Sequence, residues 1–212
     1  QLMNTNLPNL ANCMQESLKA GKVVTLPSVN TIADGTAVKR PGDLLFPYIQ
    51  INVDDIITIE DSELIVAFLD MVENHKMIVE NSGLLTVAAL KHLNVKKKKV
   101  VSILSGGNMD VITMASIVQH GLIQRDRVFT VSVLLPDKPG ELAKVATLMA
   151  EEQGNVIKLE HNQFVSINRN AAVELRITVE AFGTDHKNKI VEALKEAGYR
   201  PKLVKSKNIY DV

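Results

Sequence analysis

The first half of the chain alternates between two patterns of apolar positions, helical spacing and short continuous runs. Leu10, Cys13, Met14 and Leu18 lie at helical spacing, and Gly21 ends that segment. Helices that alternate with short apolar strands indicate an α/β body. The helices expected from the spacing are 9–20, 44–51, 60–74 and 84–93, and the extended segments are 23–27 and 55–59.

The stretch from Val100 to Asp110 predicts a strand, a turn and the start of a helix. Val100 to Leu104 holds four apolar residues in five, mostly β-branched, which predicts a short strand buried on both faces as in a parallel sheet. A polar turn, Ser105-Gly106-Gly107-Asn108, follows, and Asp110 is expected to cap the next helix. Such junctions bind anionic or cofactor ligands in α/β proteins, and a tight turn without a ligand is the alternative.

The pattern changes after Gly121–Arg127, the expected boundary between a first domain, 1–124, and a second, 128–205. Alternation predicts strands in the second domain, and helical spacing predicts two helices. The order βαββαβ is the ferredoxin-like split motif, one antiparallel sheet with two helices on one face. The expected strands are 129–135, 156–159, 173–181 and 200–204, the helices 141–153 and 185–197, with a polar hairpin at 162–170 and a tail at 206–212.

The composition excludes several classes of protein. Lys+Arg and Asp+Glu number 24 each in 212 residues, which argues against a nucleic-acid binder that relies on a global positive field. The single cysteine, Cys13, excludes an internal disulfide and fits a reducing compartment. The chain shows neither an apolar run long enough for a membrane span nor the pattern of a signal peptide, so we expect a cytoplasmic protein without a membrane partner.

Few side chains suggest catalysis by themselves. The five histidines are scattered without metal-ligand spacing, so no metal site is expected. Cys13 lies on the apolar face of the first helix and is expected to be a core residue. No Walker lysine follows Gly106-Gly107, which excludes a nucleoside-triphosphate loop. What remains is a set of three polar segments at the ends of strands or loops: 33–35, 80–83 and 105–108.

These segments, in this order, resemble a known family. The first domain resembles threonine dehydratases, which are pyridoxal-phosphate enzymes of the tryptophan-synthase-β-like fold. The motifs that carry this resemblance are Thr31-Ile-Ala-Asp-Gly35, Val38-Lys-Arg-Pro-Gly42, Val53-Asp-Asp-Ile56, Val79-Glu80 with Ser82-Gly83, and Leu104-Ser-Gly-Gly-Asn108. Leu135-Pro-Asp-Lys-Pro-Gly140 and Leu159-Glu-His161 resemble the ACT regulatory domain that is joined to many of them. The resemblance therefore implies an α/β fold: a partial pyridoxal-phosphate domain followed by a ferredoxin-like ACT domain.

The resemblance also implies a site and a reaction. Ser105 matches the serine that hydrogen-bonds the pyridine nitrogen of the cofactor, and a neutral hydroxyl makes the ring a weaker electron sink, which suits rapid β-elimination. Gly106, Gly107 and Asn108 would form the floor under the ring, Gly35 would bring backbone close to it, and Glu80 would lie nearby. The reaction implied is conversion of L-threonine, often also L-serine, to 2-oxobutanoate and ammonia, as in isoleucine biosynthesis.

For the ACT half, the resemblance implies an amino-acid effector, isoleucine or valine, bound between two paired domains. A homodimer or homotetramer is therefore expected. The turn of one domain and the following helix start would form one wall, and the start of a strand the other. The effector-binding residues expected on this basis are Asp137, Pro139, Gly140 and Leu142 on the first wall, and Asn155, Val156 and Ile157 on the second.

The chain departs from the family pattern at important positions. The lysine that binds the cofactor, in a Ser-Phe-Lys context, and the glycine-rich phosphate loop do not occur in this sequence, and Lys39 has no such motif around it. In the family both elements lie upstream, so the chain is expected to be a C-terminal part that is inactive alone. The N-terminal segment offers only Asn6 or Asn9 where the family often has a cation-binding acid, and Asn81 stands where glycine or proline is usual.

Two other functions remain open at this point. The chain could be a non-catalytic regulatory module that binds an amino acid through its ACT half. The protein could also catalyse the same β-elimination with L-serine, rather than L-threonine, as the preferred substrate.

Overall fold

The computed structural model describes residues 4–8, 11–94, 96–162 and 173–205. The chain forms two compact units, residues 1–118 and 119–212, so the units divide three residues before the boundary expected at Gly121–Arg127, within a helix that extends into that boundary. Nearly all of the expected polar hairpin, and the whole expected tail, lie outside the described residues.

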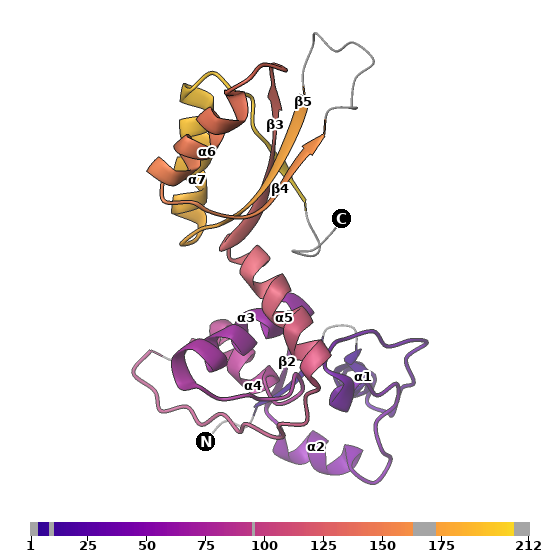
Figure 1. Cartoon of the computed structure of the whole chain (residues 1–212). Coiled ribbons are helices and arrows are strands. Elements are labelled where there is room, and N and C mark those ends of the chain that lie inside the picture. Colours follow the sequence, from indigo (N-terminus) through magenta and orange to yellow (C-terminus); the bar gives the residue numbers. More distant parts are fainter. Residues whose placement is uncertain (1–3, 9–10, 95, 163–172, 206–212) are drawn as a thin grey trace. The chain divides into compact units, whose positions relative to one another are not determined.

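The first unit combines a pair of parallel strands with several short helices (Figure 1). Asn4 lies opposite Asp55 and Pro8 opposite Ile59 in the strand pair. The elements are β1 (Asn4–Pro8), α1 (Cys13–Ala20), η2 (Asp34–Thr36), α2 (Phe46–Asn52), β2 (Asp55–Ile59), α3 (Asp61–Asp70), the π-helical η3 (Met71–His75), α4 (Leu85–Ala88), η4 (Ala89–His92) and α5 (Val111–Gln124), which runs across the division between the units.

The core of the first unit forms around one face of α3. Leu64, Ala67 and Phe68 follow helical spacing and are at most 2% exposed. The Glu60 N–H donates to Glu63 Oε2 (3.0 Å), which fixes the start of this helix. A helix overlaps each expected range, and the strand 55–59 is confirmed. The helix expected at 9–20 begins at Cys13, with residues 9 and 10 outside the described residues, the one expected at 60–74 ends in the π-helical η3, and the one expected at 84–93 is split into an α-helical and a 3₁₀ part. The sequence did not reveal β1, because a single short segment carries no signal of a partner that lies fifty residues further on.

The prediction of a strand at Val100–Leu104 is wrong. These residues form no regular element, and Val101 is 90% exposed and Ile103 72% exposed. The segment runs beside α4, where the Thr86 hydroxyl donates to the Ile103 carbonyl (3.0 Å). A β-branched run becomes a strand only when another strand completes its hydrogen bonds, and in the described part of the chain no strand pairs with this one.

The helix after this segment begins as expected. The Asp110 carboxylate accepts hydrogen bonds from the backbone N–H of Thr113 (2.8 Å) and from its hydroxyl (2.5 Å). Both bonds stabilise the charged carboxylate, so they lower the pKa of Asp110. The structure therefore confirms Asp110 as the cap of α5.

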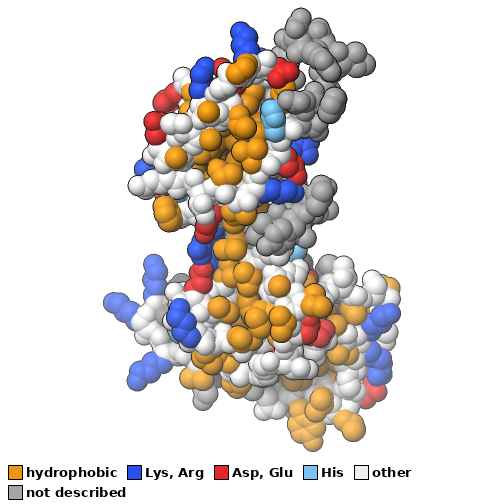
Figure 2. Space-filling model, viewed as in Figure 1, with side chains coloured by type: hydrophobic (Ala, Val, Ile, Leu, Met, Phe, Trp, Pro, Cys, Tyr) orange, Lys and Arg blue, Asp and Glu red, His pale blue; other side chains and the backbone are white. Residues whose placement is uncertain are grey.

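Helix α2 leaves most of its apolar side chains exposed. Phe46 is its buried residue, whereas Leu44, Leu45, Tyr48 and Ile51 on and before it are between 64% and 85% exposed. Figure 2 shows hydrophobic side chains gathered over this helix at the lower end of the view. Within the first unit, α2 is thus held mainly through Phe46.

The second unit is the ferredoxin-like domain that the sequence predicts. Its sheet has the order β4-β5-β3-β6 with antiparallel neighbours, and α6 and α7 lie on one face of it (Figure 1). The apolar core between the sheet and the helices includes Val131, Met149, Leu175 and Leu194. The elements are β3 (Val128–Leu135), α6 (Glu141–Glu151), β4 (Asn155–Asn162), β5 (Val173–Glu180), α7 (Thr184–Glu196) and β6 (Lys202–Val204).

Asp126 ties the start of β3 to the start of α7. Its carboxylate accepts a hydrogen bond from the Thr184 hydroxyl (2.8 Å) and pairs with Lys187 Nζ (2.8 Å). Burial by itself would raise the pKa of Asp126, but the bonds from Lys187 and Thr184 outweigh it and lower the pKa.

We expect Asp126 to make the second unit sensitive to acid. A carboxyl group with a lowered pKa in the folded state stabilises the fold above its unfolded pKa, and this stabilisation is lost as the pH falls through the folded pKa, below about pH 4. Asp126→Asn should lower the free energy of unfolding at neutral pH and flatten its decline in acid. Denaturant unfolding at several pH values measures both. The control is Asp185→Asn, and identical pH profiles for Asp126→Asn and the unmodified chain would contradict the prediction.

Candidate functional site

The three polar segments singled out in the sequence meet in the first unit. A Cβ atom built on Gly35 would lie 2.8 Å from Ser82 Oγ and 3.8 Å from Glu80 Oε1. A Cβ atom built on Gly106 would overlap the carboxyl group of Glu80. Segments 33–35, 80–83 and 105–108 therefore pack at van der Waals distance, and a side chain at position 35 or 106 would displace Ser82 or Glu80.

Glu80 is the centre of this arrangement. Its N–H donates to the Gly106 carbonyl (3.3 Å), and its Oε2 accepts a hydrogen bond from the Asn108 N–H (3.3 Å). Gly106 has φ +80°, a left-handed conformation that favours glycine. The turn after position 104 thus holds the carboxylate of Glu80 through backbone groups.

Two side chains from elsewhere in the unit hold the loop that carries Gly35. Asp61 accepts hydrogen bonds from the Thr31 hydroxyl (2.5 Å) and the Ile32 N–H (3.0 Å). The Asn81 Nδ2 donates to the Ile32 carbonyl (2.9 Å). No local sequence pattern indicates this role of Asp61, because its contact is with a loop thirty residues earlier.

Two buried polar atoms of the site have no hydrogen-bond partner in the described part of the chain: Ser82 Oγ and Asn81 Oδ1. Asn81 is only 5% exposed. Because buried polar atoms are nearly always hydrogen-bonded in folded proteins, these two atoms are candidates for a hydrogen bond to a water molecule or to a polar group of a ligand. Both residues directly follow Glu80 in the sequence, and Ser82 lies against Gly35.

The remaining residues expected to bind the cofactor lie at the surface of the same turn. Ser105 and Gly107 are exposed. The Ser105 carbonyl packs where a Cβ atom of Gly83 would be, while Gly107 has only the Ile78 carbonyl near its Cβ direction, at 3.6 Å. The structure thus brings Gly35, Glu80, Gly106 and Asn108 together and leaves Ser105 and Gly107 exposed on the same turn.

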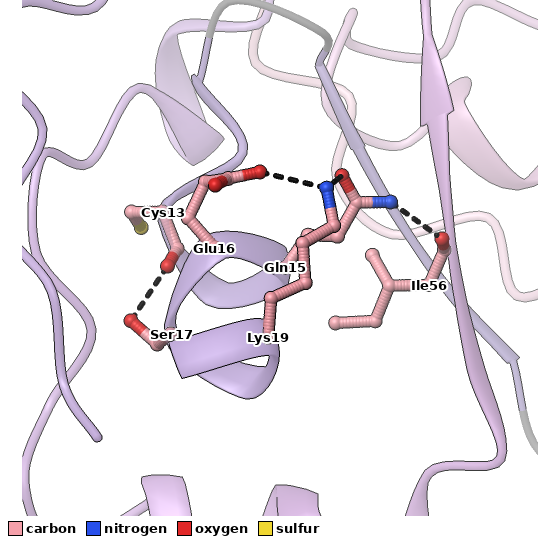
Figure 3. A network of polar contacts seen from close by, with 6 residues as sticks. All are labelled: Cys13, Gln15, Glu16, Ser17, Lys19 and Ile56. Atoms are coloured by element: carbon pink, nitrogen blue, oxygen red, sulfur yellow. Dashed lines mark hydrogen bonds and ion pairs between the residues drawn. The ribbon is translucent and has the colours of Figure 1, made fainter. Parts of the chain in front are cut away.

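Cys13 is a core residue of the first unit. It is 5% exposed, and burial raises the pKa of its thiol, which disfavours the reactive thiolate. Its carbonyl accepts a hydrogen bond from the Ser17 hydroxyl (2.7 Å), and Gln15 of the same helix donates to the Ile56 carbonyl of β2 (3.1 Å), as Figure 3 shows. Helix α1 is thereby fixed to β2 rather than to the site.

The residues expected to bind an effector fall into two groups within the second unit. Asn155 at the start of β4 pairs with Glu180, which pairs with Val128 at the start of β3. The turn at 136–140 follows the other end of β3, roughly 23 Å away for strands of this length. In the group at the start of β4, Val156 and Ile157 are exposed at a bulge of the strand. One copy of the unit therefore does not bring the two groups together.

The described residues contain no cluster of three or more His, Cys, Asp or Glu side chains that could hold a metal ion. No helix in the described ranges is both long and apolar enough to cross a membrane.

Two protein families match the chain, one for each unit. Residues 7–106 match the family described as pyridoxal-phosphate dependent enzymes, and residues 129–198 match the ACT domain. An L-threonine ammonia-lyase from Geobacter sulfurreducens is 36% identical over 191 residues, which cover 89% of this chain and 48% of the relative. The chain thus spans about half the length of this curated relative.

Solved structures show the same relationship for part of the chain. The processed form of threonine deaminase isoform 2 from Solanum lycopersicum is similar with a TM-score of 0.52 and 28% identity, covering 55% of this chain and 33% of that one. Maize serine racemase is similar with a TM-score of 0.50 and 36% identity, covering 54% of this chain and 36% of that one.

Proposed function

Because this chain joins a segment of the pyridoxal-phosphate-dependent enzyme family to an ACT domain, we propose that it carries the pyridine-ring side of the cofactor site and the regulatory half of a threonine dehydratase. The observation that carries the proposal is the convergence of Gly35, Ser82, Glu80 and Gly106 at a point where buried polar atoms have no partner. The similarity to an L-threonine ammonia-lyase along most of the chain supports it.

The residues present fit the ring end of pyridoxal phosphate. Ser105 would hydrogen-bond the pyridine nitrogen. Gly35 and Gly106 let the main chain pack closely against Ser82 and the Glu80 carboxyl group, and Ser82 Oγ, beside Gly35, is a buried polar atom without a partner in the described part of the chain. When bound, the cofactor supplies an electron sink. A hydroxyl at the ring nitrogen does not force its protonation, as a carboxylate would. Glu80, whose carboxyl group accepts a hydrogen bond from the Asn108 N–H, would lie near the ring.

The reaction proposed is β-elimination from L-threonine. L-Threonine loses one water to give an enamine, and hydrolysis of the enamine consumes one water, so one L-threonine gives one 2-oxobutanoate and one ammonia. L-Serine is the second candidate substrate, and the similarity to maize serine racemase favours a site that accepts a β-hydroxy amino acid. A cytoplasmic location stays a prediction.

The cofactor proposal is tested by titrating the isotope-labelled chain with pyridoxal phosphate. We expect shifts of the backbone amide signals of Gly35, Glu80 and the turn 105–108, and we expect Ser105→Ala to weaken them, whereas the control Ser102→Ala should not. The lysine motif of the family does not occur in this sequence. We therefore expect the chain alone to form no 2-oxobutanoate from L-threonine.

Two results would count against this proposal. If the amides of the site do not respond to pyridoxal phosphate, the cofactor assignment fails. If the chain alone attaches the cofactor in stoichiometric amounts or forms the oxo acid, its expected inactivity is wrong.

The ACT half is proposed to bind an amino acid, isoleucine or valine, between two copies. The turn at 137–140 of one copy would then meet Asn155–Ile157 of the other, which supports a homodimer because one copy holds these groups apart. Calorimetry of the chain with isoleucine, valine, threonine and serine tests this. Saturable binding without any response to pyridoxal phosphate would favour a purely regulatory module, for which the complete ferredoxin-like fold of the second unit is the supporting observation.

A further inference from the structure

The second unit contains a hollow that none of the expected effector residues lines. It has a volume of ≈ 510 Å³ and lies between the end of β3, the first turns of α6 and the connection from α7 to β6. Pockets for small ligands have volumes of this size. Its polar side chains are Glu141, Lys144, Tyr199 and Arg200, and Leu134 and Pro136 are on its apolar side.

The single carboxylate of the hollow is already occupied. Glu141 Oε1 pairs with Lys144 Nζ (2.6 Å), and Glu141 Oε2 accepts a hydrogen bond from the Tyr199 hydroxyl (3.3 Å). The bond from Lys144 is the main reason that the pKa of Glu141 is lowered, so this carboxyl group is charged at neutral pH. An ammonium group entering the hollow would compete with Lys144 for its one anionic partner.

The charged side chains of the hollow carry an excess of positive charge, because two cations, Lys144 and Arg200, accompany one carboxylate, Glu141. The exposed guanidinium of Arg200 makes no hydrogen bond or ion pair to any other residue in the described part of the chain. The Lys144 side chain is 67% exposed while its partner Glu141 is 15% exposed, so the cation of this pair faces the solvent. A guanidinium binds a carboxylate with two parallel hydrogen bonds.

The apolar side of the hollow favours a ligand whose remaining part is apolar. Leu134 is 50% exposed at the end of β3, and Pro136 next to it is also exposed. Burying this surface under a short aliphatic chain removes it from water. The hollow thus offers a cationic end and an apolar end.

We propose that this hollow binds a short aliphatic 2-oxo acid, with its carboxylate on Arg200, its oxo group toward Lys144 and its carbon chain on Leu134 and Pro136. The choice of an oxo acid among small carboxylates rests on the proposed function, because 2-oxobutanoate is the product of that reaction. The preference for an anion without an ammonium group rests only on the side chains of the hollow.

The test compares two ligands with the same carbon skeleton, 2-oxobutanoate and L-2-aminobutanoate. Titration of the full chain, followed by calorimetry and by amide signals, should show saturable binding of the oxo acid, with shifts at Leu134, Gly198 and Arg200. The amino acid should bind at least about tenfold more weakly, because its ammonium group adds a cation to a hollow whose one carboxylate already pairs with Lys144. Arg200→Gln should weaken binding of the oxo acid by about tenfold or more, while the control Lys189→Gln on α7 leaves it unchanged.

Four outcomes would overturn the proposal: no saturable binding of the oxo acid, equal affinity for both ligands, no effect of Arg200→Gln in a variant with an unchanged circular dichroism spectrum, or tighter binding of inorganic phosphate. Because the measurement is binding, its result is independent of turnover. A chain without a catalytic role can still bind the oxo acid here, and a chain that fails this test can still be part of a threonine dehydratase.

Discussion

Gly106→Ala should destroy the arrangement around Glu80, while Gly107→Ala next to it should leave the arrangement intact. Gly106 has φ +80°, and an alanine in this left-handed conformation costs about 1–2 kcal/mol. Its Cβ atom would overlap the carboxyl group of Glu80. Because a glutamate side chain is flexible, Glu80 would move aside and lose its bond from the Asn108 N–H.

Gly107 differs from its neighbour in both respects. Its φ is not among the positive values, and its Cβ direction meets only the Ile78 carbonyl at 3.6 Å, an ordinary van der Waals contact. Gly107→Ala is therefore the matched control: the same substitution, one position along the same turn. A similar response of the two variants to pyridoxal phosphate would contradict the prediction.

The two variants are compared by denaturant unfolding and by the amide signals of Glu80 and Asn108. For Gly106→Ala we expect the free energy of unfolding to fall by about 1–2 kcal/mol, from the cost of holding alanine in the left-handed conformation alone. We also expect the amide signals to lose their response to the cofactor. For Gly107→Ala we expect stability and response close to those of the unmodified chain.

Phe68→Ala should have the largest effect on stability in the first unit. Phe68 is fully buried, in the same apolar cluster as Ala33, which lies in the loop that carries Gly35, and as Val79, which precedes Glu80. Deleting a buried phenylalanine side chain costs about 3–5 kcal/mol, because apolar contacts are lost and a cavity remains. The site should loosen together with the core beneath it.

Phe182→Ala provides the control for this change. Phe182 is 81% exposed and stacks on His186 with ring centroids 4.9 Å apart, so its removal should change the free energy of unfolding by less than about 1 kcal/mol. Urea unfolding with residue-resolved amide signals distinguishes the units. If Phe68→Ala leaves the signals around Glu80 at their normal midpoint, the core does not support the site as inferred.

The sequence predicts most of the second unit and the place of the site, for physical reasons. Alternating strands and amphipathic helices are local patterns, and in a ferredoxin-like domain each element buries one face on its neighbours. The cap at Asp110 is equally local, since donor and acceptor are three residues apart. The three polar segments were found through their order along the chain, which reflects the family rather than any local rule.

What the sequence could not predict depends on distant partners. Val100 to Leu104 has the composition of a strand, but a strand also requires a neighbouring strand. The exposed Val101 shows that composition alone does not determine whether this segment forms a strand. The bond between Asp61 and Thr31 spans thirty residues, and the fit of Gly106 against Glu80 depends on how two turns pack. None of these contacts has a periodicity that a sequence pattern could show.

The separation of the two expected effector walls along the sheet has a consequence for measurements in solution. If a single binding site draws one wall from each of two copies, effector binding and self-association share one equilibrium. Diluting the protein should then weaken the apparent affinity for the effector, and adding the effector should shift the sedimentation of the chain toward the dimer. A domain with both walls on one copy would show an affinity independent of protein concentration.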